Sequence, residues 1–139
     1  MYQRILLAID GSDNAFRAAQ EAIKLAKLTE TSTIDVLYVV NVDKVKNELL
    51  LAGTIDNMEL ARQRKIAPVE EALKEANVSY QTTILKGLPG PEIVRYANDQ
   101  QVDLVVIGSR GLNSLQEMVL GSVSHKVMKR VHCPALIVK

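Results

Sequence analysis

The chain has little of what nucleic-acid-binding and membrane-binding proteins rely on. It contains no Trp and one Phe, so we expect no aromatic platform that stacks single-stranded bases. Its 17 basic and 16 acidic residues leave a net charge of +1. That balance gives no support to attraction by bulk charge to a nucleic acid or a membrane surface. We therefore expect neither kind of partner.

Long apolar runs and cysteine pairs are also missing. The N-terminal apolar run, residues 5–9, is too short for the core of a signal peptide or for a membrane span. The single Cys133 cannot form an internal disulfide, which fits a cytoplasmic location, and we expect it to be a small buried residue. With 139 residues, 47% of them apolar, the chain suits a single domain over residues 1–139.

Several short segments read as buried strands. Residues 4–10, 34–40, 104–107 and Ala135–Val138 are nearly continuous in Ile, Leu, Val and Ala, which is typical of parallel strands covered on both faces. The segment "VSYQTTIL", residues 78–85, alternates instead, with Val78, Tyr80, Thr82 and Ile84 on one side. This alternation predicts a half-exposed strand at a sheet edge.

Helical periodicity lies between these strands. Alanines and Ile23 repeat at three and four residues after Ser12, which we expect to be the N-cap. A second helix covers about 55–77, with a kink or a restart at Pro68. A third begins at Pro91, and a fourth runs over 122–131. The connection 41–54 is predicted to be a long loop.

The alternation of strands and helices predicts an α/β fold. We expect a five-stranded parallel sheet in the order 3-2-1-4-5 with helices on both faces, in a Rossmann-like arrangement. A crevice then opens where the order reverses, between the first and fourth strands. The loop "DGSD", residues 10–13, and the loop "GSRGLNSLQEMVLGSVS", residues 108–124, both face that crevice.

The second of these loops has the composition of a phosphate site. Gly108 and Gly111 permit a tight turn, and Gly121 with Ser122, Val123 and Ser124 opens the last helix. Free N–H groups and the positive dipole end of a helix attract phosphate. Gly and Ser before a helix are also an ordinary cap, which leaves that interpretation open. Neither GxxxxGK[ST] nor GxGxxG occurs, so neither a Walker A loop nor a dinucleotide fingerprint is present.

The spacing of these glycines resembles a known family. Gly108-x-x-Gly111, nine residues and then Gly121-Ser122 are similar to the G-2x-G-9x-G-[S/T] pattern of ATP-binding universal stress proteins. The opening "ILLAIDGSDNA" and the closing "HCPALIVK" also resemble that family, so the likeness covers the whole chain. It implies a fold similar to that of adenine nucleotide α-hydrolases and a bound adenine nucleotide, ATP with Mg²⁺ or Mn²⁺.

The resemblance also implies a pose for the nucleotide. Asp10 would lie near adenine and ribose, and the backbone of Val40 would meet the adenine. Gly108 and Gly111 would pass the ribose and phosphates, and the run from Gly121 to Ser124 would hold the phosphates. Arg110 is either a phosphate donor or an exposed side chain on a loop.

Nothing in the sequence predicts fast catalysis. The two histidines, His125 and His132, lack further ligands for a metal, and we expect them at the surface. Asp10 and Asp13 could hold a cation or orient water, or could serve only in turn and capping chemistry. We therefore expect no catalytic residues, no protein-built metal site, and slow ATP hydrolysis at most.

The last strand is predicted to form an apolar sheet edge. Such an edge invites pairing with a second copy, and the family resemblance implies the same, so we expect a homodimer through about Ala135–Val138. A loop covering this edge is the alternative. Three functions remain open: a nucleotide-binding stress-response regulator, an adenine-nucleotide-hydrolysing enzyme of a related fold, and a dimeric interaction module with a vestigial pocket.

Overall fold

The computed structural model describes residues 1–111 and 120–139 of the chain. A five-stranded sheet has the order β3-β2-β1-β4-β5, and neighbouring strands are parallel, as the sequence predicts. The strands are β1 (Arg4–Ile9), β2 (Thr33–Asn41), β3 (Ser79–Gly87), β4 (Leu104–Gly108) and β5 (Ala135–Val138). The helices are α1 (Asp13–Ala26), α2 (Val45–Ala52), α3 (Ile55–Glu75), α4 (Pro89–Asp99) and α5 (Ser122–Arg130).

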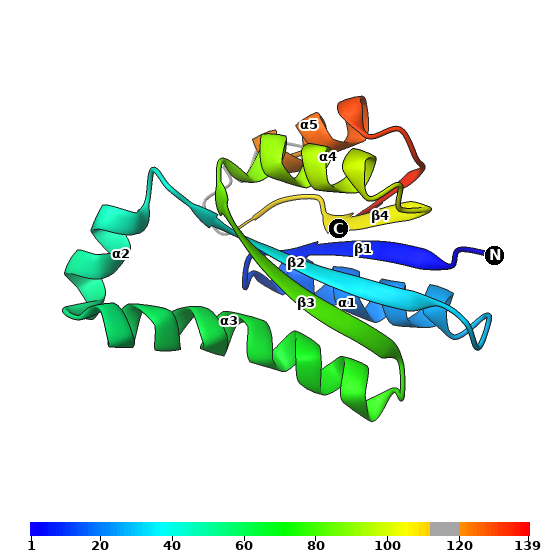
Figure 1. Cartoon of the computed structure of the whole chain (residues 1–139), viewed down its shortest axis with the longest axis horizontal. Helices are drawn as coiled ribbons and strands as arrows, with labels where there is room; N and C mark the ends of the chain where they lie inside the picture. The colour runs from blue at the N-terminus through cyan, green and yellow to red at the C-terminus, as the bar shows by residue number, and fades with distance from the viewer. Residues whose placement is uncertain (112–119) are drawn as a thin grey trace.

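Helices cover both faces of the sheet (Figure 1). α1 and α3 lie on one face and α4 and α5 on the other, while α2 projects beyond the sheet next to the start of α3. Among the described residues, no helix is both long enough and apolar enough to cross a membrane.

The two apolar layers explain why the central strand β1 is apolar from Ile5 to Ile9. In β1, Ile5, Leu7 and Ile9 pack toward α1 and α3, whereas Leu6 and Ala8 pack into the cluster on the α4 and α5 side. Successive side chains of a strand point to opposite faces of the sheet. A strand covered on both faces therefore has apolar residues at successive positions.

The predicted loop over 41–54 is wrong, because it contains α2. Val45, Leu49 and Ala52 repeat at four and three residues and lie on the half-buried side of this helix. No residue of α2 is fully buried, and its neighbour among the helices is α3. The apolar stripe is short and only half-buried, so the sequence pattern does not distinguish this helix from a loop.

The two expectations that concerned proline also need correction. α4 begins two residues earlier than predicted, with Pro89 rather than Pro91 in the first helical position. α3 continues through Pro68 as one helix without a restart. Ile66 and Val69, both nearly inaccessible, anchor the helix on either side of Pro68, which itself lies on the exposed side. Burial on both sides outweighs the single hydrogen bond that Pro68 removes.

β3 is an edge strand as predicted, but its alternation is less regular. Val78 and Tyr80 pack against the core on the α1 and α3 side. Ile84, expected on that same inward side, is 44% exposed, while Leu85 packs into the opposite cluster beneath α4. The far end of this edge strand is therefore buried through its other face.

A buried carboxylate joins the two central strands at the end away from the loops that follow them. Asp35 of β2 is 1% exposed and accepts hydrogen bonds from Arg4 Nε and Gln81 Nε2, both at 2.8 Å. Arg4 also donates to the backbone oxygen of Gln100 at 3.2 Å. A buried carboxylate needs such partners, so Arg4 keeps β1, β2 and the end of α4 together.

We expect Arg4→Met to lower the free energy of unfolding by ~2 kcal/mol, because it leaves the Asp35 carboxylate buried without its cation. Urea denaturation followed by circular dichroism measures the change. Lys24→Met is the matched control, since its partner Glu21 and Lys24 itself are exposed. A control loss as large as that of Arg4→Met would contradict the importance of burial at Asp35.

Candidate functional site

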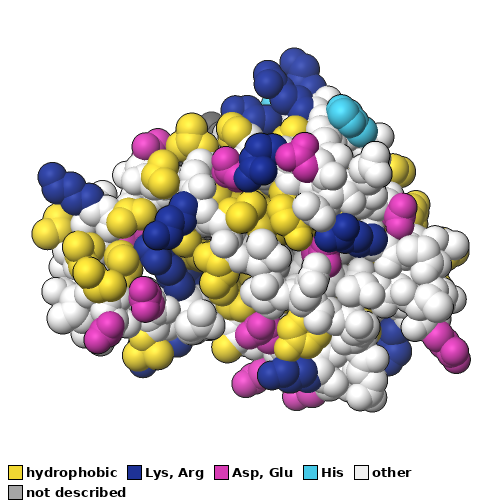
Figure 2. Space-filling model, viewed as in Figure 1, with side chains coloured by type: hydrophobic (Ala, Val, Ile, Leu, Met, Phe, Trp, Pro, Cys, Tyr) yellow, Lys and Arg dark blue, Asp and Glu magenta, His cyan; other side chains and the backbone are white. Residues whose placement is uncertain are grey.

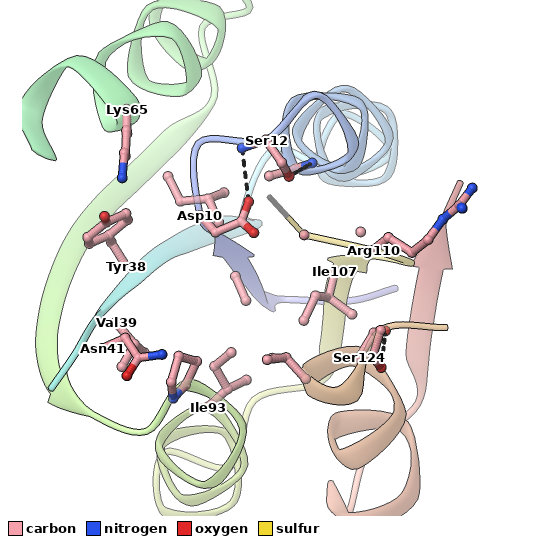
Figure 3. A pocket seen from close by; sticks show the side chains of 18 of the residues that line it. Asp10, Ser12, Tyr38, Val39, Asn41, Lys65, Ile93, Ile107, Arg110 and Ser124 are labelled. Atoms are coloured by element: carbon pink, nitrogen blue, oxygen red, sulfur yellow. Dashed lines mark hydrogen bonds between the residues drawn. The ribbon is translucent and has the colours of Figure 1, made fainter. Parts of the chain in front are cut away.

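A cleft lies at the carboxyl ends of the strands, where the strand order reverses between β1 and β4. Its volume is about 700 Å³. The walls come from the loops after β1 and β4, the end of β2, and parts of α2, α3, α4 and α5 (Figure 3). The sequence predicts a crevice at this position, and the cleft brings together segments more than a hundred residues apart.

The loop after β1 presents a carboxylate to the cleft. Asp10 Oδ1 accepts the backbone N–H of Ser12 at 2.9 Å, and Ser12 Oγ accepts the N–H of Ala15 at 3.1 Å, which caps α1 (Figure 3). A Cβ on Gly111 would overlap Asp10 Oδ2. The glycine therefore lets the loop after β4 come directly against this carboxylate. Asp13 lies in the first turn of α1 and is exposed.

The end of β4 is equally crowded. A Cβ on Gly108 would lie 2.9 Å from Asn14 Cβ and 3.0 Å from the Asn14 carbonyl carbon. Ser109 is buried; its Oγ accepts from Asn14 Nδ2 at 3.2 Å and its N–H donates to the Val138 oxygen at 2.7 Å. The loop is thus bonded to α1 on one side and β5 on the other. The sequence analysis did not single out Ser109 or Asn14.

The start of α5 forms the wall opposite α3. Gly121 is buried and donates its N–H to the Ser109 oxygen at 2.7 Å. Ser124 Oγ donates to the same oxygen at 2.7 Å, with the Gly121 oxygen at 3.1 Å. Its hydroxyl hydrogen is directed to the backbone, whereas Ser122 is exposed. No described residue accepts a hydrogen bond from the backbone N–H groups of Ser122 and Val123, so both groups can donate to a ligand.

Of the two other predicted site residues, Arg110 lines the cleft and the Val40 side chain does not. Val40 does not line the cleft with its side chain, which is buried toward α1 and α3, while its neighbours Val39 and Asn41 do line it. The contact predicted for Val40 involves its backbone and stays a prediction. Arg110 lines the cleft, but its side chain extends away from Asp10 (Figure 3). Residues 112–119, the middle of the predicted loop, lie outside the described residues.

A further wall, which the sequence analysis missed, comes from β2, α2 and α3. Tyr38 and Glu48 line the cleft, and Glu48 pairs with Arg62 at 3.5 Å. Burial raises the pKa of the Tyr38 hydroxyl above its ordinary value, and the nearby Glu48 carboxylate raises it further. Tyr38 therefore keeps its proton at neutral pH and is a donor at the cleft surface. Glu48 was missed because α2 itself was not predicted.

The histidines and the cysteine lie outside the cleft lining. His125 and His132 are exposed, as expected. Cys133 is half-buried rather than buried as expected. Burial raises the pKa of its thiol, which makes it a weak nucleophile. In the described part of the chain, no group of three or more His, Cys, Asp or Glu side chains could hold a metal ion.

Comparisons with known proteins show the family of this chain. A sequence model of the universal stress protein family matches residues 1–139. The chain belongs to the universal stress protein family. It is 34% identical over 157 residues to the universal stress protein YxiE of Bacillus subtilis, with 100% of both chains covered.

Two proteins of Methanocaldococcus jannaschii are also similar to this universal stress protein. The universal stress protein MJ0531 is 35% identical over 143 residues, covering 100% of this chain and 83% of the relative. The solved structure of MJ0577 superposes with a TM-score of 0.84 at 28% identity, covering 100% of this chain and 96% of that one. The fold and the family predicted from the sequence are therefore confirmed.

We expect Gly108→Ala to lower the free energy of unfolding by about 1–3 kcal/mol, because the new Cβ would press on the backbone of Asn14. Thermal or urea unfolding measures it. Gly90→Ala is the matched control: it too is a buried glycine, but its new Cβ would approach only the flexible Lys126 side chain, at 3.0 Å from Cδ. Equal stability of wild type and Gly108→Ala would show that the close approach is dispensable.

Proposed function

We propose that this universal stress protein binds ATP in the cleft, with Mg²⁺ or Mn²⁺, and acts as a nucleotide-binding stress-response regulator in the cytoplasm. One observation carries the proposal: the open N–H groups at the start of α5 face the same cleft as Asp10. The first are suited to phosphate, and the Asp10 carboxylate is suited to a ribose hydroxyl or to a metal ion held by the phosphates. The volume of about 700 Å³ falls within the range of small-molecule sites.

The fold itself is able to hold adenine nucleotides. A universal stress protein has been solved in complex with cAMP, at 22% identity and a TM-score of 0.71, with 99% of this chain and 97% of that one covered. An Arabidopsis thaliana member has been solved with AMP bound, at 19% identity and the same TM-score, with 99% and 91% covered. At these identities the two structures are similar to this chain in fold only. The proposal that this chain binds a nucleotide therefore depends on the residues of its own cleft.

The acidic residues of the cleft fit a metal ion that arrives with the nucleotide. Two carboxylates line the cleft, Asp10 and Glu48, and Glu48 is already paired with Arg62. Mg²⁺ commonly keeps several waters and binds phosphate oxygens with one or two carboxylates. Asp10 would supply such a ligand, and the ion would neutralise phosphate charge.

Hydrolysis is expected to be slow. Phosphoryl transfer needs a positioned nucleophile and strong stabilisation of the developing charge. Neither exposed histidine lines the cleft, and the Asp10 carboxylate already accepts the Ser12 N–H. This arrangement favours a protein that holds ATP over one that turns it over rapidly.

We expect Gly121→Val to abolish binding of ATP with Mg²⁺, because an isopropyl group would occupy the space in front of the α5 amides. Gly121 has φ −71° and ψ 164°, which any residue adopts, so the substitution introduces no backbone strain. Isothermal titration calorimetry measures affinity, and circular dichroism checks the fold.

Ala61→Val is the matched control, since Ala61 is exposed on α3 outside the cleft lining. Small molecules released by denaturing the purified protein should include an adenine nucleotide. Equal ATP affinity in wild type and Gly121→Val would remove the phosphate assignment. Rapid release of ADP or AMP would favour the hydrolase instead.

We also propose that two copies pair through β5. β5 lies at one end of the sheet order, and its Leu136 is 36% exposed. The carbonyl groups of Pro134 and Val138 point toward β4, where they accept from Val105 and Ser109. Alternate residues of a strand direct their backbone groups to opposite sides, so Ile137 directs its N–H to the open edge. An open apolar edge favours pairing with a second copy.

We expect Ile137→Pro to convert the dimer to a monomer, because proline removes the N–H that faces the open edge. Light scattering coupled to gel filtration measures the mass. Ile84→Pro on the other edge strand, β3, is the control and should leave the dimer intact. A wild-type protein with the mass of one chain would overturn the pairing.

A further inference from the structure

One cation of the cleft wall has no role in the nucleotide pose described above. Lys65 lies in the middle of α3, lines the cleft, and projects into it on the same side as Tyr38 (Figure 3). Within residues 1–111 and 120–139, its ammonium group has no hydrogen-bond or ion-pair partner. A cation held this way at a cleft surface attracts an anionic ligand.

The methylene stem of Lys65 packs against Gly11, and this contact is called the Gly11 seat below. A Cβ on Gly11 would lie 2.8 Å from Lys65 Cγ and 2.9 Å from Lys65 Cβ. The methylene stem therefore lies flat on the loop after β1, directly beside Asp10. Gly11 also has φ +87°, where side chains other than glycine are strained. Contact and backbone conformation both require glycine there.

α3 fixes the direction of the stem. Ile66 and Val69, 1% and 3% exposed, anchor the adjoining turns in the core. The preceding Arg64 is exposed to solvent. The backbone position of Lys65 at the cleft is therefore set by the packing of α3 rather than by a flexible loop.

Basic side chains outnumber acidic ones among the described residues that line the cleft. Lys44, Lys65 and Arg110 are the basic residues of the lining, and Asp10 and Glu48 are the acidic ones. Glu48 is paired with Arg62, which lies outside the lining. Basic groups and the positive end of α5 thus outweigh the carboxylates, which favours a ligand carrying negative charge. The basic side chains on the face of the molecule in Figure 2 are otherwise interspersed with acidic ones.

We propose that Lys65, seated on Gly11, contacts the bound ligand and makes the cleft select phosphorylated nucleosides over unphosphorylated ones. This inference rests on the proposed function and adds a specificity-determining residue on α3, outside the glycine pattern of the last loop. Its ammonium group approaches the ligand from the α3 side of the cleft, across from the start of α5 (Figure 3). Attraction to this positive charge strengthens binding only when the ligand carries a phosphate.

The test compares ATP, AMP and adenosine by calorimetry on the whole protein. Lys65→Met keeps the stem on Gly11 and removes the charge. We expect it to weaken ATP binding roughly tenfold and to leave adenosine binding unchanged. The dependence of ATP affinity on salt should also become shallower. Lys65→Arg should retain most of the ATP preference, and Lys74→Met, at an exposed position in the last turn of α3, is the control.

A double-mutant cycle tests the Gly11 seat. Gly11→Ala should lower the preference for ATP over adenosine in wild type, because the new Cβ displaces the Lys65 stem. It should not lower that preference further in the Lys65→Met protein, where the charge is already absent, since backbone strain at φ +87° weakens the binding of both ligands alike. A further loss of the preference in the double mutant would overturn the role of Gly11. Equal losses for ATP and adenosine in Lys65→Met, or no loss, would overturn the inference while the proposed function stands. A wild-type protein that binds none of the three ligands would overturn the proposed function itself.

Discussion

Two positions with no room for a side chain hold the loops of β1 and β4 together. Gly108 lies against the backbone of Asn14, and Gly111 lies against the carboxylate of Asp10. The parallel sheet brings the carboxyl ends of these strands to one edge, but only the missing Cβ atoms let the loops touch. The cleft, the direction of Asp10 and the start of α5 all depend on this approach.

Around that contact, the backbone carries much of the chemistry. Ser109 links α1, β5 and the start of α5 through its hydroxyl, its N–H and its carbonyl oxygen. The Ser124 hydroxyl donates a hydrogen bond to that same carbonyl oxygen. What remains for a ligand at this wall is therefore the N–H groups of Ser122 and Val123, preorganised by bonds that are already made. Under the proposed function, an anion would bind at this wall without rearranging it.

The sequence predicted the parts that depend on repeating patterns. Continuous apolar runs located β1, β2, β4 and β5, although β5 is only partly buried at the sheet edge. The spacing of Gly108, Gly111 and Gly121 located one wall of the cleft. It did not predict α2, whose apolar stripe is only half-buried. Nothing in the sequence separates Lys65 from its exposed neighbour Arg64, because the difference is the packing of α3 over Gly11. Residues that meet only in three dimensions leave no local signal.

The central claim is that the amides at the start of α5 and the end of β1 bind one adenine nucleotide together. Amide chemical shifts of isotope-labelled protein during a titration with ATP and Mg²⁺ test it most directly. The account predicts saturable shifts concentrated at Gly121, Ser122, Val123 and Asp10. Saturable shifts confined to another surface, or no shifts at millimolar ATP, would contradict it.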